Sequence, residues 1–287
     1  MWSSGRARRR PTEGPTAAVK LAISGKGGVG KTTLSAMLAA GLAMRGRHVI
    51  AIDADPDANL AAALGVPDDE AVTPLSRMQQ LIEERTGARK GYGAFFKLNP
   101  RVDDIPETFA RRVGPIRLLV LGGVSAGGDG CICPATAVLK ALLVHLILGR
   151  DDALVMDMEA GIEHLGRATG QSMDAMLVVV NPEPWSVQTA RRVHDLAADI
   201  GLKRVFAVAN RVRGPEQLPE VRRQLGPVPL LGHVPQDDRF AGGLLDIDPE
   251  GGIAPREALR AHLPAVEDIL GQLRQRTQAP EKETPHE

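Results

Sequence analysis

The sequence is poor in cysteine, with only Cys131 and Cys133 among its 287 residues. Two thiols one residue apart cannot form the disulfide framework of a small secreted protein, so the pair indicates an intracellular protein that keeps these residues for chemistry. An excess of charge is also absent, because 35 basic residues balance 35 acidic ones. A net charge of zero gives no overall attraction to nucleic acid or to an anionic membrane, and we expect neither as a partner.

Long apolar runs are absent as well. The most apolar helix that we expect, at residues 134–148, contains Lys140 and His145 and is shorter than the roughly 20 residues that cross a bilayer. Residues 1–18 are rich in arginine and lead to Lys20 rather than to the apolar stretch of a signal peptide. We therefore expect a cytoplasmic protein. The hydrophobic content of 43% excludes disorder of the whole chain.

Short runs rich in valine, isoleucine and leucine alternate with longer helical segments. Because these runs are continuously apolar, both faces of the sheet should be covered by helices, which predicts a doubly wound, mostly parallel α/β sheet. The expected strands are residues 19–24, 49–53, 117–121, 154–158, 176–181, 204–209 and 230–234. The expected helices are residues 31–45, 74–86, 134–148, 185–200, 215–225 and 256–276.

One domain should span residues 18–276. The apolar pattern thins between residues 65 and 114, and we interpret this polar segment as an insertion on the domain. Residues 1–17 form a basic arm and residues 277–287 form a tail; both are polar, contain proline and have nothing to bury, so we expect them to be flexible.

Residues 25–32 read Gly-Lys-Gly-Gly-Val-Gly-Lys-Thr and match the phosphate-binding pattern G-x-x-x-x-G-K-[ST]. The motif follows an expected strand and begins an expected helix, so its N–H groups can converge on phosphate oxygens at a helix N-terminus. Lys31 would pair with the β- and γ-phosphates of ATP, and the Thr32 hydroxyl would ligate Mg²⁺. The residues expected to contact the nucleotide are Gly25, Gly27, Gly28, Val29, Gly30, Lys31, Thr32 and Thr33.

Lys26 is a second lysine in this loop, and the phosphate cradle alone does not account for it. Its position resembles the signature lysine of the deviant Walker A (SIMIBI) type of P-loop NTPase, the class that includes MinD, ParA and the nitrogenase iron protein. In that class the extra lysine reaches the nucleotide of the partner subunit. The resemblance thus implies a catalytic role for Lys26 and Lys31 in a homodimer; a solvated loop lysine is the alternative.

Acidic residues end two of the expected strands. Asp53 and Asp55 follow one strand and Asp157 ends another, at the edge where open α/β sheets bind ligands. By resemblance, Asp55 orients or deprotonates the attacking water, and Asp157 is the Walker B carboxylate that holds Mg²⁺ through water. We interpret Asp57 as a helix cap, because aspartate is a preferred residue there.

The same class suggests residues that contact the base of the nucleotide. Asn210 ends its expected strand and resembles the base-contacting asparagine of these ATPases. Pro235 and Asp237, in residues 235–237, resemble the segment that lines the adenine in this class.

The cysteine pair lies just before the helix that begins at Pro134. A Cys-x-Cys unit offers two thiolates to one metal ion, whereas a tetrahedral zinc site needs four ligands, which two copies in a symmetric dimer would supply. The helix N-terminus should lower the pKa of both thiols. A pair of buried small hydrophobic residues is the alternative. We interpret His145 as a core or interface residue rather than a ligand, and we assign no role to His164.

Four segments together resemble the CooC family, over about residues 18–270. They are residues 25–60, Phe96-Lys97-Leu98-Asn99-Pro100, Gly130-Cys131-Ile132-Cys133-Pro134, and the run from Asp157 to His164. CooC proteins are ATPases that mature nickel-containing carbon monoxide dehydrogenase, and a related branch serves acetyl-CoA synthase. The resemblance implies that Cys131 and Cys133 of two subunits hold one Ni²⁺ or Zn²⁺ at the dimer interface. It also implies that ATP or metal tightens the dimer and that the client is the apo-enzyme.

Other members of the class remain alternatives at this point. A MinD-like protein should end in a basic amphipathic helix, and a ParA-like protein should show a basic surface cluster, for which the arginine-rich arm is the only candidate. A reductase like the nitrogenase iron protein usually separates its cysteines along the chain. We keep it as the second interpretation, because a doubled Cys-x-Cys pair also offers four thiolates to an iron–sulfur cluster.

Overall fold

The computed structural model describes residues 19–70, 72–88, 96–122, 133–148, 153–159 and 165–278. Its strands are β1 (Lys20–Gly25), β2 (Val49–Asp53), β3 (Arg111–Val113), β4 (Ile116–Val120), β5 (Ala153–Asp157), β6 (Ala175–Val180), β7 (Val205–Val212), β8 (Leu230–Pro235), β9 (Leu245–Ile247) and β10 (Ile253–Pro255). Its α-helices are α1 (Lys31–Met44), α2 (Leu60–Leu64), α3 (Gln79–Thr86), α4 (Ile105–Phe109), α5 (Pro134–Leu148), α6 (Arg167–Ser172), α7 (Pro184–Asp199), α8 (Leu218–Leu225) and α9 (Glu257–Gln278).

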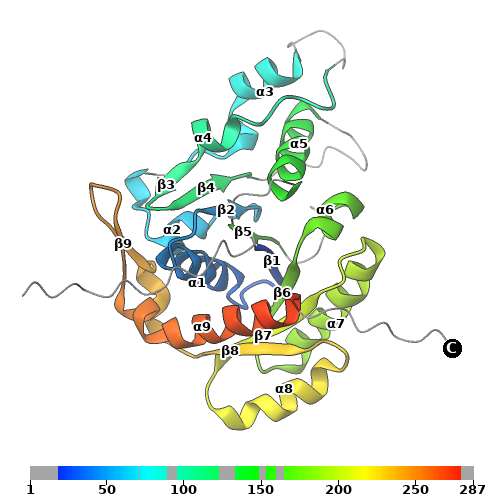
Figure 1. Cartoon of the computed structure of the whole chain (residues 1–287), viewed down its shortest axis with the longest axis vertical. Helices are drawn as coiled ribbons and strands as arrows, with labels where there is room; N and C mark the ends of the chain where they lie inside the picture. Colours follow the sequence, from blue (N-terminus) through cyan, green and yellow to red (C-terminus); the bar gives the residue numbers. More distant parts are fainter. Residues whose placement is uncertain are drawn as a thin grey trace, which may run out of the picture.

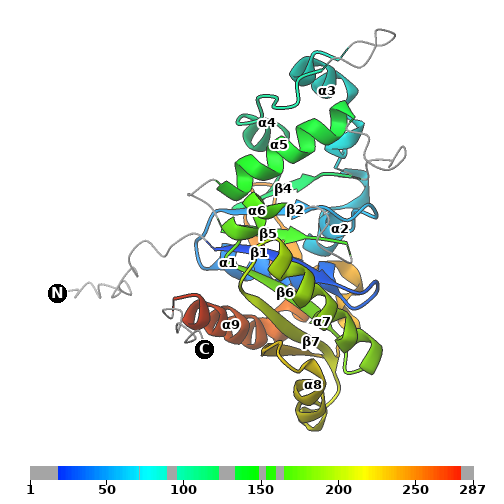
Figure 2. The same ribbon diagram turned by 90° about the vertical axis from the view of Figure 1, so that its right-hand side faces the viewer.

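An eight-stranded sheet forms the centre of the described part, in the order β3-β4-β2-β5-β1-β6-β7-β8. The pairs from β4 to β8 are parallel, and β3 pairs antiparallel with β4 at the edge. Strands β9 and β10 form a separate antiparallel pair. The sheet runs through the middle of the molecule, with α3 and α4 towards one end and α8 at the other (Figure 1, Figure 2). The predicted doubly wound, mostly parallel sheet is confirmed.

Two apolar cores lie on opposite faces of this sheet. In β2, Ile50 and Ile52 face one core while Val49 and Ala51 face the other, as expected for a strand whose side chains alternate between faces. Helices α1, α2 and α9 pack in one core, and α3, α5, α7 and α8 contribute to the other. Every residue of β2, β5 and β6 is buried, which explains their continuous apolar runs.

The structure corrects several predicted boundaries. The segment predicted as one helix from residue 74 to 86 is a 3₁₀ turn at Leu75–Arg77 followed by α3, because Met78 leaves the helical conformation with ψ 75°. Residues 277–278, predicted to begin the tail, continue α9, where the Thr277 hydroxyl donates to the Leu273 carbonyl. The basic arm and residues 279–287 lie outside the described ranges.

The segment interpreted as an insertion adds to the central sheet. Strand β3 escaped prediction because it is three residues long and begins with two exposed arginines. Helix α3 packs through Leu81 and Ile82 into the same core as α5. Among the described helices, none combines the length and the apolar composition needed to cross a membrane.

Gly65 ends α2 in a conformation that should tolerate no side chain. Its φ is 97°, and an added Cβ would lie 2.2 Å from the Leu245 carbonyl oxygen. Gly87 ends α3 with φ 72° but has open space around it, so it provides a matched control. We expect Gly65→Ala to lower the free energy of unfolding by about 2–4 kcal/mol, the sum of left-handed strain and overpacking, and Gly87→Ala by about 1 kcal/mol. Urea unfolding measures both, and equal losses would contradict the packing described for Gly65.

Candidate functional site

The loop between β1 and α1 is shaped by glycines at both of its ends. An added Cβ at Gly25 (φ 147°) would lie 2.6 Å from the Val179 carbonyl oxygen, and one at Gly30 (φ 97°) would lie 2.2 Å from Asn210 Nδ2. Gly27 and Gly28 instead border open space, where a phosphate group could approach the backbone. Gly30 precedes α1 without a side-chain cap, so the first turn of the helix presents its N–H groups to an anion.

The two lysines of this loop have different environments. Lys31 is buried, with 7% of its surface exposed, and its Nζ lies 3.9 Å from Asp55 Oδ2. Lys26 is exposed. Lys31 is therefore directed into its own site, whereas Lys26 is available to a molecule outside it.

Two carboxylates end adjacent strands beside the loop. Asp53 in β2 and Asp157 in β5 are register partners, and both are completely buried. The Ser35 hydroxyl of α1 donates to Asp157 Oδ1 at 3.1 Å. The other oxygen, Oδ2, is buried and has no hydrogen-bond partner within the described residues. An orphaned carboxylate oxygen at this edge suits the hydration shell of a hard cation such as Mg²⁺.

Burial shifts the pKa of both carboxyl groups upward. It raises the pKa of Asp157 to about 6, although hydrogen bonds from Thr32 and Ser35 and the charge of Lys31 oppose the rise. Burial raises the pKa of Asp53 to about 7, and the negative charges of Asp157 and Asp55 add to it, while two backbone N–H groups oppose it. A divalent cation at this edge would favour the ionised forms.

Asp53 also shapes the loop that carries Asp55. Its Oδ1 accepts the N–H of Asp55 at 3.2 Å, and its Oδ2 accepts the N–H of Leu60, the first residue of α2, at 2.8 Å. The prediction that Asp57 caps this helix is wrong, because Asp53 supplies the carboxylate and the Asp57 N–H donates to Asp55 Oδ1. Sequence reasoning placed Asp53 at the strand end but missed this role. The loop after β2 folds back so that Leu60, seven residues later, contacts Asp53, and no local sequence pattern marks this contact.

Asn210 lies at the phosphate loop. Its Nδ2 donates to the Val29 carbonyl at 2.8 Å, and its side chain is buried. Pro235 ends β8 opposite Val212 of β7 and is exposed. The predicted role of both residues at the base stays a prediction.

Asp237 lies in an ion-pair cluster. Its carboxylate accepts hydrogen bonds from the side chain and the N–H of Arg239, which hold the pKa of Asp237 near 2, well below its usual value. The buried His262 of α9 places Nδ1 3.6 Å from the same carboxylate. An adenine contact from Asp237 would have to share this carboxylate with Arg239.

Cys133 directly precedes α5 and is half-buried. Its Sγ lies 3.1 Å from the Thr136 hydroxyl and accepts the Thr136 N–H at 3.5 Å. Partial burial alone would raise the pKa of the thiol, but the hydroxyl and N–H of Thr136 and the N–H of Ala135 bring it below its usual value. The predicted lowering at the helix N-terminus is confirmed for Cys133. Cys131 and His164 lie outside the described residues, and the described ranges contain no cluster of three His, Cys, Asp or Glu side chains suited to a metal.

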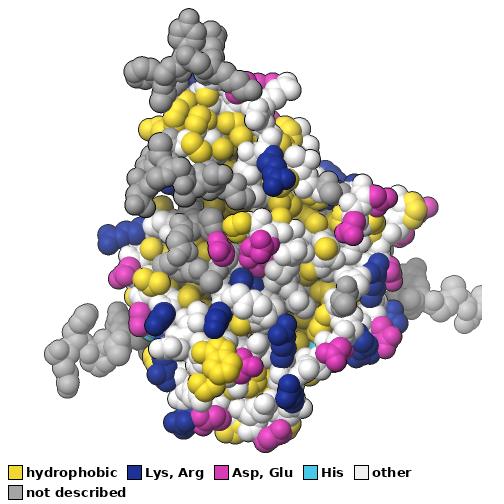
Figure 3. Space-filling view, turned by 180° about the vertical axis from the view of Figure 1, so that it is seen from behind, with side chains coloured by type: hydrophobic (Ala, Val, Ile, Leu, Met, Phe, Trp, Pro, Cys, Tyr) yellow, Lys and Arg dark blue, Asp and Glu magenta, His cyan; other side chains and the backbone are white. Residues whose placement is uncertain are grey.

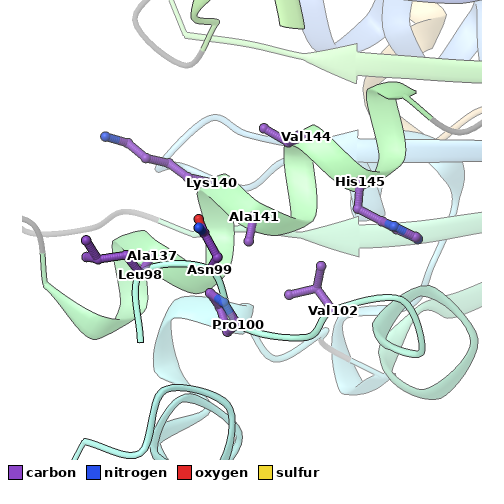
Figure 4. Close-up of a pocket in the computed structure, with 9 residues that line it drawn as sticks. All are labelled: Leu98, Asn99, Pro100, Val102, Ala137, Lys140, Ala141, Val144 and His145. Atoms are coloured by element: carbon purple, nitrogen blue, oxygen red, sulfur yellow. The ribbon is translucent and has the colours of Figure 1, made fainter. Parts of the chain in front are cut away.

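Helix α5 borders an open groove of about 410 Å³ with the segment that precedes α4 (Figure 4). Hydrophobic side chains gather at this end of the molecule (Figure 3). His145 is exposed in the groove, so it is not a core residue, and the alternative of an interface residue stays a prediction. Leu98, Asn99 and Pro100 belong to one of the segments that carry the family resemblance, and they thus lie beside α5, the helix that follows Cys133. The groove is lined by Leu98, Asn99, Pro100, Val102, Ala137, Lys140, Ala141, Val144 and His145.

Comparison with known proteins agrees with this geometry. Residues 20–245 match the model of the CobQ/CobB/MinD/ParA nucleotide-binding domain. The chain is 45% identical to the carbon monoxide dehydrogenase accessory protein CooC of Rhodospirillum rubrum, over 76% of this chain and 84% of that protein. It is 43% identical to an uncharacterized ATP-binding protein of Methanocaldococcus jannaschii, over 80% of this chain and 92% of that protein.

Solved structures of MinD have a similar fold. The MinC:MinD cell division complex of Aquifex aeolicus gives a TM-score of 0.60 at 21% identity and covers 94% of this chain and 99% of that one. MinD of Pyrococcus horikoshii, complexed with Mg-ADP, gives 0.55 at 22% identity, with coverages of 91% and 96%.

The buried charge of Asp157 should make stability depend on pH. The folded protein binds the carboxyl proton of Asp157 more tightly than the unfolded chain does. Below about pH 4 the carboxyl group is largely protonated in both states and its burial costs little, whereas above about pH 7 it is ionised in both states and the full cost of burying the charge lowers stability. We expect Asp157→Asn to stabilise the protein without nucleotide or Mg²⁺ by roughly 2 kcal/mol above pH 7, and by little near pH 4. Urea unfolding across this range measures the difference, with the exposed Asp199→Asn as control. A stabilisation independent of pH would contradict the assignment.

Proposed function

This chain belongs to the CobQ/CobB/MinD/ParA nucleotide-binding family and, within it, to the CooC-type proteins, and we propose that it is an ATP-hydrolysing accessory protein that delivers nickel to carbon monoxide dehydrogenase. The observation that carries the ATPase proposal is the edge of the sheet where Lys31, Asp55 and Asp157 converge on an uncapped helix N-terminus. The CooC relative supports the client, and the lowered pKa of Cys133 supports metal binding.

Hydrolysis would use the residues of this edge in distinct roles. The loop N–H groups and Lys31 hold the phosphates, and Thr32 and Asp157, the latter through water, would hold Mg²⁺, which neutralises charge on the phosphates. Asp55 orients a water molecule whose oxygen attacks the γ-phosphorus. The bond from that phosphorus to the β-γ bridging oxygen breaks, ADP departs, and the water proton passes to Asp55 or solvent. Lys31 must exchange its contact with Asp55 for phosphate when nucleotide enters.

A second subunit would complete the site. The exposed position of Lys26 leaves it free to reach a nucleotide bound in the partner, as its resemblance implies. Trp185, which is 58% exposed, lies in the first turn of α7, at the same carboxyl edge of the sheet. An exposed indole at this edge suits burial in a homodimer that forms on ATP binding.

Metal binding would use the same dimer. Two thiolates from Cys131 and Cys133 of each subunit give the four ligands of a tetrahedral Ni²⁺ or Zn²⁺ site, and this ion is cargo for the apo form of carbon monoxide dehydrogenase. The 45% identity to a CooC protein favours this proposal over an iron-protein-like reductase.

The two lysines should give different defects. We expect Lys31→Ala to abolish ATP binding, because it removes the buried phosphate contact. Lys26→Ala should leave ATP binding to the monomer intact and lower turnover by about a hundredfold or more, the usual effect of removing a group that stabilises transition-state charge. Calorimetry with ATP and a phosphate-release assay measure these effects, with Lys140→Ala on α5 as control. Hydrolysis by Lys26→Ala at the parent rate would exclude action across the dimer.

The proposed metal site has a defined stoichiometry. We expect one Ni²⁺ or Zn²⁺ per two chains in anaerobically purified protein, by elemental analysis and size-exclusion chromatography with light scattering. Replacing Cys131 and Cys133 by serine should abolish the ion and spare ATP binding. If ATP tightens the dimer, metal and ATP should raise each other's affinity by the same factor, typically about 5- to 150-fold.

Three results would count against this site. They are one ion per chain, an ion retained by the double serine variant, or the visible spectrum of an iron–sulfur cluster.

A further inference from the structure

Asn210 makes a contact that a residue devoted to the base would not need. Its Nδ2 donates to the carbonyl of Val29, inside the phosphate loop, at 2.8 Å. The loop's own Val29 N–H contact with the Lys26 carbonyl is longer, at 3.4 Å. The bond from Asn210 is therefore the tighter restraint on this part of the loop.

The alternation of β7 turns the side chain of Asn210 towards the loop, because Phe206 and Val208 on the same face of the strand pack in the core that contains Val29. The register of β7 with β8 shifts between Ala209 and Val212, and Arg211, between them, has φ 57°. The left-handed conformation is uncommon for a residue with a side chain, and bulges of this kind re-aim neighbouring side chains. The irregularity follows Asn210 and changes the face of Val212, which packs in the opposite core.

The contact fixes the orientation of one peptide group. In a planar trans peptide, the carbonyl of Val29 and the N–H of Gly30 point in opposite directions. With the Val29 carbonyl held by Asn210, the Gly30 N–H points away from Asn210. An added Cβ at Gly30 would lie 2.2 Å from Asn210 Nδ2, so this glycine leaves room for the amide that orients it.

We propose that Asn210 is a positioning residue for phosphate, holding the Val29–Gly30 peptide so that the Gly30 N–H faces the phosphates of the nucleotide. This inference rests on the proposed nucleotide-binding function and changes the role that resemblance implied for Asn210. A residue that reads the base acts only on ligands that have one. A residue that acts through the loop affects every ligand that carries phosphates.

Inorganic tripolyphosphate separates these two roles, because it has the phosphates of ATP without sugar or base. We expect Asn210→Ala to weaken the binding of ATP and of tripolyphosphate, both with Mg²⁺, by the same factor. The loss of one neutral hydrogen bond corresponds to roughly 2- to 10-fold. Asn210→Asp, which has the same shape but places an acceptor against the Val29 carbonyl, should weaken both ligands further. Asn99→Ala, in the groove beside α5, is the matched control.

Competition against a fluorescent ATP analogue gives both affinities, and thermal melting shows that each variant is folded. A fall for ATP without a fall for tripolyphosphate would overturn the proposal in favour of a base contact. Unchanged binding of both ligands by Asn210→Ala would overturn it as well, and so would a parent protein that binds ATP but not tripolyphosphate. If the parent binds neither ligand, the proposed nucleotide site itself fails, which is a separate result.

Discussion

The burial of two carboxylates side by side is the constraint around which this site is arranged. Asp53 and Asp157 end neighbouring parallel strands in register, away from water, where each disfavours the ionisation of the other. Parallel strands impose this proximity, since their carboxyl ends share one edge of the sheet. The Ser35 hydroxyl on Asp157 and two backbone N–H groups on Asp53 offset part of the cost of burying these charges. The second oxygen of Asp157 has no partner within the described residues, so a bound cation would offset the rest. A site with this imbalance is suited to bind Mg²⁺ together with a phosphate ligand.

The phosphate loop depends on contacts from distant parts of the chain. Gly25 approaches β6 and Gly30 approaches Asn210 of β7, so the neighbouring strands determine where glycine is required. Some glycines of the motif are therefore required because the loop packs against the sheet, and the others leave the backbone open to phosphate. The same dependence joins Asp55 to the core, because the completely buried Asp53 holds the loop that carries it.

Sequence reasoning succeeded where local pattern and structure coincide. Strand β2 and helix α5 have their predicted bounds, because a continuously apolar run and a proline at a helix start are local signals. It failed where tertiary contacts decide, as at Met78, which breaks a predicted helix, and at Asp57, whose capping role belongs to Asp53. The contact from Asn210 to Val29 spans 181 residues, so no local pattern marks it.

The proposed function makes nickel transfer depend on ATP hydrolysis, because the edge that binds nucleotide would also join the subunits that share the ion. The most direct measurement is the activation of apo carbon monoxide dehydrogenase by the nickel-loaded protein with MgATP, followed as carbon monoxide oxidation over time. The account predicts sustained activation by the parent protein, and none beyond a single round by Asp55→Asn, which should bind ATP but not turn it over. Equal activation by both proteins, or by free nickel alone at the same concentration, would contradict it.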